Sequence, residues 1–102
     1  MSETNRPANW PATWSGKTWQ GGRYDDALDP YWVLTEEELW RLYGVLGRPQ
    51  DDRSAEEIRA QIARTLDVRT CSAPKANRAL QLLRQKGLAE HTGQPRRWRR
   101  VG

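Results

Sequence analysis

The sequence predicts one small α+β domain that is mainly helical, with a β-hairpin at its C-terminal end and an extended arm at its N-terminal end. The chain has 102 residues, a length that suits one domain rather than two. Residues 33–102 contain three amphipathic stretches, followed by two short strand-forming segments on either side of a turn. Residues 1–32, which we call the arm, show no helical or strand period.

The arm holds four of the six tryptophans, together with three prolines and three glycines. Proline and glycine break regular elements, but this many tryptophans is unlike a disordered tail, which is usually poor in aromatic residues. We therefore expect Trp10, Trp14 and Trp19 to be anchored on a surface. That surface is either the chain's own small core, or a protein partner or second copy of the chain.

The first helix is predicted to begin after Thr35. Thr35 and Glu38 have the spacing of a capping box, and Leu34 and Leu39 have that of a hydrophobic staple. Glu36 and its two neighbours lie in the first turn, where the helix dipole favours acidic residues, and this explains the acidic run better than a metal site does. The helix is predicted to bury Leu39, Leu42, Tyr43 and Leu46 and to end at Gly47 and Pro49.

Two more helices follow. The second opens with a capping box between Ser54 and Glu57 and has an apolar face. The third is predicted to begin near Ser72, with Pro74 in its first turn, and to end at Gly87. The inward-facing residues are predicted to be Ala55, Ile58, Ile62 and Leu66 in the second helix, and Ala76, Ala79, Leu80 and Leu83 in the third.

The C-terminal residues predict a β-hairpin. Residues 88–92 favour one strand, Gly93-Gln94-Pro95 favours a turn, and residues 96–101 favour the returning strand. The returning strand carries Arg96, Arg97, Arg99 and Arg100 around Trp98.

Charge is distributed unevenly along the chain. Residues 1–52 have five basic and nine acidic side chains, a balance of −4, whereas residues 53–102 have twelve basic and four acidic, a balance of +8. After Val68 the only acidic residue is Glu90, against nine lysines and arginines. Such a field attracts polyanions. The alternative is a tail that only aids solubility, but these charges alternate with apolar residues at structural spacing.

The outer face of the predicted third helix has the residue types that contact a duplex. Lysine and arginine neutralise phosphates, asparagine and glutamine pair with adenine, and arginine pairs with guanine. The same residues also suit an ordinary solvated helix face. The residues in question are Lys75, Asn77, Arg78, Gln81 and Arg84.

The segment PKANRALQLLRQKGLAEHTGQPRRWRRV (residues 74–101) resembles winged helix-turn-helix domains. It combines a third helix that ends in L-x-x-K-G-L, Leu83 to Leu88, with a basic hairpin, which that superfamily calls the wing. The resemblance covers residues 35–102. It implies a winged helix-turn-helix domain over residues 33–102 that binds double-stranded DNA, with the third helix in the major groove and the wing arginines on the backbone.

Part of the same segment resembles the Zα domains, which bind left-handed duplexes. Asn77-Arg78 matches their Asn-Arg pair, and Pro95 to Trp98 falls where they have a Pro-Pro-x-Trp wing. Gln81, Ala73 and Arg96 stand where those domains have an aromatic residue, a lysine and a second proline. The resemblance therefore implies an alternative, recognition of Z-form DNA or RNA by shape.

The remaining residues favour a protein that is not an enzyme and has no cofactor or metal. His91 is the only histidine and Cys71 the only cysteine, and no phosphate-binding glycine-rich loop is present. No stretch is long and apolar enough to cross a membrane, and the first ten residues do not read as a secretory signal. We expect an intracellular, cytoplasmic protein, associated with the nucleoid if it is prokaryotic, that acts as a small transcription regulator. A further alternative is a winged-helix protein-interaction module that meets an acidic partner, such as a polymerase subunit.

Overall fold

The structure is a computed structural model that describes residues 10–22, 31–46, 54–92 and 97–101. These residues form an α+β fold with three α-helices and two antiparallel hairpins. In chain order the elements are η1 (Ala12–Trp14), β1 (Thr18–Gly21), β2 (Trp32–Thr35), α1 (Glu36–Val45), α2 (Ala55–Leu66), α3 (Pro74–Gln85), β3 (Ala89–Thr92) and β4 (Arg97–Arg100).

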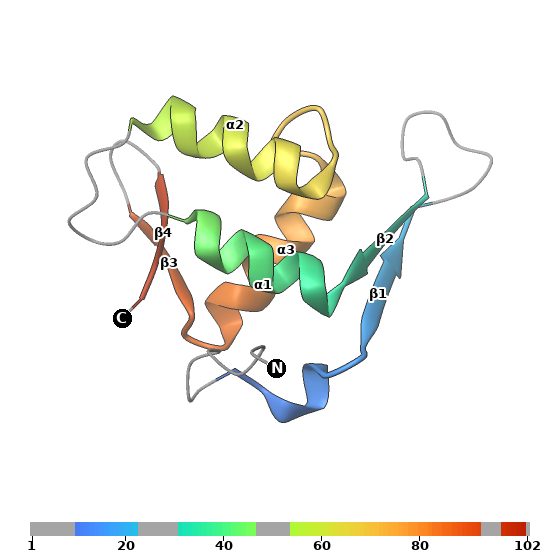
Figure 1. Ribbon diagram of the computed structural model, residues 1–102. Coiled ribbons are helices and arrows are strands. Elements are labelled where there is room, and N and C mark those ends of the chain that lie inside the picture. Colours follow the sequence, from blue (N-terminus) through green and yellow to red (C-terminus); the bar gives the residue numbers. More distant parts are fainter. Residues whose placement is uncertain (1–9, 23–30, 47–53, 93–96, 102) are drawn as a thin grey trace.

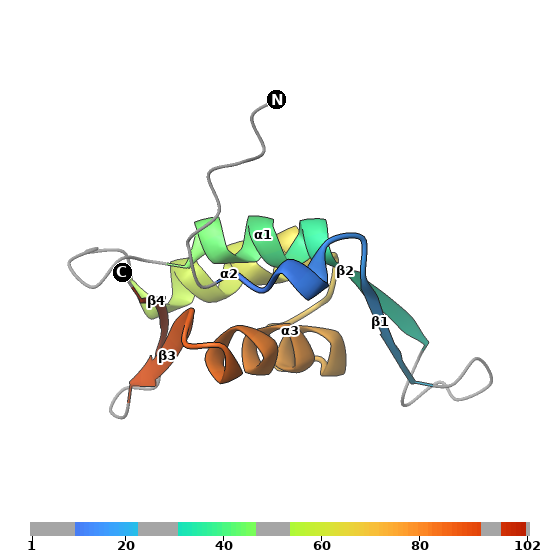
Figure 2. The same ribbon diagram turned by 90° about the horizontal axis from the view of Figure 1, so that it is seen from below.

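The three helices pack against one another, and the two hairpins lie at opposite ends of the helical layer (Figures 1 and 2). Strand β2 contacts α1 and α3, whereas β3 follows directly from α3 and packs on it. Helix α3 therefore runs from one hairpin to the other, and α1 and α2 lie together along one side of it (Figure 2).

Both predicted capping boxes are present. The Glu38 backbone N–H donates to Thr35 Oγ1 at 3.2 Å, and the Thr35 N–H donates to Glu38 Oε1 at 3.0 Å. Ser54 and Glu57 make the same pair of bonds at the start of α2. Helix α3 begins at Pro74, two residues after the predicted start, with Ala73 as an N-cap that gives no side-chain bond.

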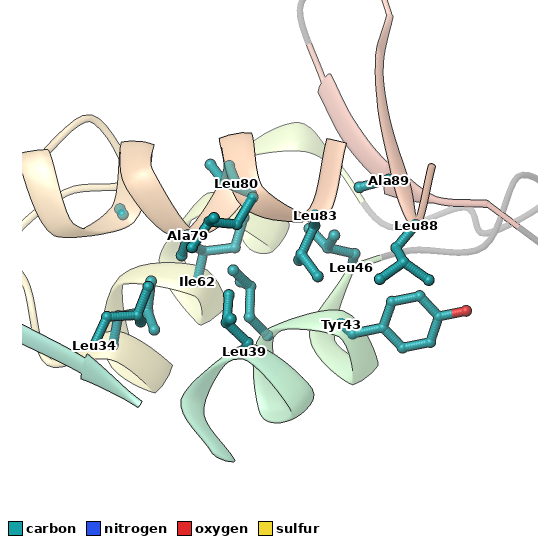
Figure 3. Packing of buried hydrophobic residues seen from close by; sticks show 14 of the residues in the cluster. Leu34, Leu39, Tyr43, Leu46, Ile62, Ala79, Leu80, Leu83, Leu88 and Ala89 are labelled. Carbon is teal, nitrogen blue, oxygen red and sulfur yellow. The ribbon is translucent and has the colours of Figure 1, made fainter. Parts of the chain in front are cut away.

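The hydrophobic core contains nearly all of the residues predicted to face inward (Figure 3). Leu34 and Leu39, the predicted staple, are both fully buried. The exception is Ala55, which is half-buried, and Leu82 is buried although it was not predicted. The buried leucines and isoleucines come from all three helices and β2, so a single core joins them.

The arm is more ordered than its sequence predicts. Residues 18–21 form β1, which pairs with β2 in the register Thr18↔Thr35 to Gly21↔Trp32. No helical or strand period in residues 1–32 indicated β1 or η1, and the structure shows both. The predicted boundary between residues 32 and 33 falls inside β2, so the described part of the arm belongs structurally to the same domain.

Gly21 and Trp32 lie opposite each other in this hairpin, and the indole covers the glycine. A Cβ atom at Gly21 would lie 2.4 Å from Trp32 Cζ2, far inside van der Waals contact. The indole N–H is buried here, and it has no hydrogen-bond partner among the residues that the structure describes. The ring packs over Gly21 and against the core cluster.

The second hairpin confirms the predicted strands, with β3 and β4 lying inside residues 88–92 and 96–101. Gly87 adopts a φ of 74°, and Leu88 N–H donates to Leu83 O at 2.9 Å while Gly87 N–H donates to Arg84 O at 3.0 Å. This is the Schellman arrangement, which ends α3 and turns the chain into β3. The predicted turn at residues 93–95 and the predicted helix end at residues 47 and 49 lie outside the described residues.

Candidate nucleic-acid interface

Helix α3 has one buried and one exposed face. Ala76, Ala79, Leu80 and Leu83 are buried against α1 and α2, as the helical period requires. Four of the exposed side chains on the opposite face were predicted, Asn77, Arg78, Gln81 and Arg84, and Gln85 is exposed there as well.

The two arginines of this face have no anionic neighbour. Within the part of the chain that the structure describes, neither Arg78 nor Arg84 forms an ion pair or a hydrogen bond through its guanidinium group. Arg69 and Lys86 flank α3 in the sequence, and both are also exposed. Exposed positive charge therefore extends along α3, and the guanidinium groups of Arg78 and Arg84 have no hydrogen-bond partner among the described residues.

Asn77 is oriented by its neighbours. Its side-chain amide donates to the carbonyl oxygen of Ser72 at 3.0 Å. The bond links the first turn of α3 to the preceding connection, where Thr70 and Ser72 also share a hydrogen bond between their hydroxyls at 2.8 Å. The side chain is thus held in place at the N-terminal end of the exposed face.

Lys75 does not share this face, although it was predicted to. Its Nζ lies 2.8 Å from Glu38 Oε2, and its side chain is only 12% exposed. The helical period places residue 75 at the margin of the buried face, beside α1. This cation is engaged inside the protein, and the interface that we describe excludes it.

Trp98 lies in the β3–β4 hairpin and faces the core. Its indole stacks on the imidazole of His91, the opposite residue in the register, with 4.5 Å between ring centroids and 9° between planes. Trp98 is half-buried and packs against the core cluster. Its described contacts join the hairpin to the rest of the domain.

Two of the four hairpin arginines already have partners inside the chain. The Arg99 guanidinium forms an ion pair with Glu90, its cross-strand neighbour. The Arg100 guanidinium lies 5.5 Å from the ring centroid of Tyr43 in α1, in a cation–π contact. Arg96 and the side chain of Arg97 lie outside the described residues.

The arm tryptophans contact the chain's own core. Trp14 is 3% and Trp19 is 9% exposed. Trp10 is half-buried, its indole N–H donates to Glu36 Oε2 at 2.8 Å, and its ring meets those of Trp14 and Tyr43 edge-on. The sequence left open whether these tryptophans contact the chain's own core or a partner. Their described contacts are with the core.

Sequence reasoning did not identify Glu38 as the partner of Lys75, or Tyr43 as the surface beneath Arg100. These residue pairs are far apart in the chain, and no local spacing signals them. Cys71, the lone cysteine, is half-buried beside the core.

Among residues 10–22, 31–46, 54–92 and 97–101, no three histidine, cysteine or acidic side chains are grouped so that they could hold a metal ion. The helices of the same ranges are all too short or too polar to span a bilayer. Comparisons with protein-family models, curated proteins and solved structures find no match to this chain.

Proposed function

We propose that this chain is a non-enzymatic, double-stranded DNA-binding protein of the winged helix-turn-helix type. The observation that carries the proposal is the exposed face of α3, where Asn77, Arg78, Gln81 and Arg84 lie together without anionic partners among the described residues. In this proposal, α3 enters the major groove and the β3–β4 hairpin is the wing.

The chemistry of the face suits base edges. A major groove admits an α-helix, and there an amide side chain pairs with adenine while a guanidinium pairs with guanine. Asn77 and Gln81 would supply the amides, and Arg78 and Arg84 the guanidinium groups. Because all four belong to one rigid helix of 12 residues, they would approach the duplex together.

The order of elements supports the fold assignment. Helices α1, α2 and α3 are followed immediately by a two-stranded hairpin that packs on α3. A wing in this position would lie along the backbone beside the helix. Arg96 and Arg97 are its proposed phosphate contacts, since Arg99 and Arg100 are engaged by Glu90 and Tyr43.

The biological role that we propose, by analogy with the fold, is that of a small cytoplasmic transcription regulator. Fold alone does not decide function. The exposed side chains of α3 therefore carry the functional proposal.

The test compares two variants by fluorescence anisotropy with a labelled duplex pool. Arg78→Ala with Arg84→Ala removes two charges from the proposed interface, and we expect affinity to fall at least tenfold, since one base-edge arginine is worth about 1–3 kcal/mol. The control, Arg41→Ala, removes an exposed arginine that pairs with Glu37 on α1. Equal affinity in both variants would contradict the proposal.

A further inference from the structure

Strand β2 has an outer edge at which the backbone groups of Val33 have no partner among the described residues. The Glu36 N–H donates to Lys17 O at 3.2 Å, so residues 17 and 36 are a hydrogen-bonded pair of the antiparallel ladder. Such pairs alternate with pairs whose N–H and C=O groups point away from the partner strand. By this alternation, the backbone groups of Val33 and Thr35 point to the outer edge of β2, and those of Gln20 point to the outer edge of β1.

The capping box supports this assignment. The Thr35 N–H indeed points outward, where it donates to Glu38 Oε1. The Val33 N–H and C=O have no such partner among the described residues. Val33 also has an exposed side chain, 37% accessible, which is unusual for a large apolar residue in this protein.

The edge of β2 lacks two of the features that protect an edge strand. Proteins protect such strands by keeping them short, by placing charged residues, prolines or bulges in them, or by covering them. Strand β2 is short, with four residues. The sequences of β1 and β2, TWQG and WVLT, contain no charged residue and no proline. The β1–β2 hairpin is a two-stranded sheet, so no described strand covers the edge of β2.

A pocket of about 510 Å³ lies beside this edge. One wall is formed by residues 31–33, and the other by the α2–α3 connection and the first residues of α3. The lining is mainly apolar, with Trp32, Val33, Val68 and Pro74 among its residues. A strand edge and an apolar pocket side by side are the two elements of a peptide site that works by strand addition.

We propose that an extended peptide segment of another protein binds here as a third strand beside β2. Its backbone would bond the Val33 N–H and C=O, and alternate side chains, which must be apolar, would enter the pocket. The proposed peptide site uses β2 and residues 73–75, whereas the proposed DNA contacts of α3 are Asn77, Arg78, Gln81 and Arg84.

Charge complementarity gives the peptide a further property. Asp67 and Arg69 both line the far wall, are exposed, and form no ion pair with a described residue. Lys75, the other cation of the lining, is neutralised by Glu38. A peptide that carries an acidic residue opposite Arg69 and a basic residue opposite Asp67 would match this wall. A polyanion such as DNA matches this wall less well than such a peptide, because the carboxylate of Asp67 lies on the same wall as Arg69.

The test begins with a displayed library of random eight-residue peptides selected on the immobilised full chain. The enriched peptide is then synthesised and titrated against the protein. We expect apolar residues at alternate positions, and we expect Val33→Pro, which removes the outward N–H, to weaken binding at least tenfold. The matched control is Gln20→Pro, because Gln20 is the cross-strand partner of Val33 and its N–H points to the opposite edge of the hairpin. We expect Gln20→Pro to change the affinity for the peptide less than twofold.

Amide hydrogen exchange of the wild-type protein provides a readout that does not depend on whether a proline variant folds. The enriched peptide should slow exchange at the Val33 amide and leave the Gln20 amide unchanged. Arg69→Glu should reverse the preference for an acidic residue in a second selection. Failure to enrich any peptide, or equal binding by Val33→Pro and Gln20→Pro, would overturn the proposal. A dimer in sedimentation that Val33→Pro dissociates would also overturn it, since the occupant would then be a second copy.

Discussion

The Nζ of Lys75 lies 2.8 Å from Oε2 of Glu38, and this ion pair joins the first turn of α3 to the first turn of α1. The same Glu38 side chain caps α1 through Thr35. One carboxylate therefore determines where α1 begins and also anchors the start of the proposed recognition helix. Lys75 is thus a structural residue in α3, whereas Arg78 and Arg84 have no ion-pair partner among the described residues.

Replacement of Lys75 should lower stability and leave DNA affinity nearly unchanged. Lys75→Ala leaves a partly buried carboxylate without its cation, and we expect a loss of about 1–2 kcal/mol, between the values for exposed and buried pairs. Urea denaturation measures this loss, and Lys86→Ala, which removes an exposed lysine just beyond α3, is the control. A large fall in duplex affinity for folded Lys75→Ala would place Lys75 in the interface after all.

Two glycine substitutions should have effects of opposite sign. Gly21→Ala would drive a Cβ into the Trp32 ring, and overpacking of this kind costs about 1–3 kcal/mol. Gly44→Ala meets no atom within 4 Å, and alanine in a helix interior is favoured over glycine by about 0.5–1 kcal/mol. Thermal denaturation of both variants provides the comparison. A stabilising Gly21→Ala would show that Trp32 does not lie over Gly21.

Loss of the arm should unfold the domain. Trp14 is almost fully buried, and replacing such a residue by alanine costs about 3–5 kcal/mol, a large part of the total stability of a small domain. A fragment of residues 33–102 lacks Trp14, Trp19 and β1, and we expect it to show no cooperative melting transition by circular dichroism. Removal of residues 1–9 alone leaves every described residue in place and should be tolerated. A stable 33–102 fragment would restore the boundary predicted at residue 32.

The wing arginines should divide into two classes. Each phosphate contact contributes about −0.9 to the slope of log affinity against log salt concentration. Arg96→Ala with Arg97→Ala should therefore make the slope shallower by about 2. Arg99→Ala with Arg100→Ala should change it less, because Glu90 and Tyr43 already engage these side chains. Binding isotherms at several salt concentrations test this, and equal changes in slope would show that both pairs reach the backbone.

Local signals in the sequence predicted most of the helical structure. Thr35 and Ser54, each three residues before a glutamate, located two helix starts, because a capping box involves only residues within one turn. The third start was less well predicted, since Ala73 provides no cap for a pattern to reveal. Gly87 marked the end of α3 because only a residue that tolerates positive φ suits that position.

The pairings between distant residues were not predictable in this way. Strand β1 has four residues, including a glycine, and it is stabilised by β2 and by burial of Trp19 rather than by its own pattern. The exposed face of α3 followed from its helical period, but the removal of Lys75 from that face depends on Glu38, 37 residues away. The sequence therefore could not show which of the predicted cations pair with a residue of the chain itself, because such pairing depends on tertiary structure.

The most direct test of the central claim is a titration of the unmodified chain against a labelled duplex pool at two salt concentrations. If α3 and the wing bind DNA, affinity should be measurable at low salt and should fall steeply as salt rises, because bound phosphates release counterions. Absence of binding at low salt would contradict the account. The exposed face of α3 would then be an ordinary solvated helix surface.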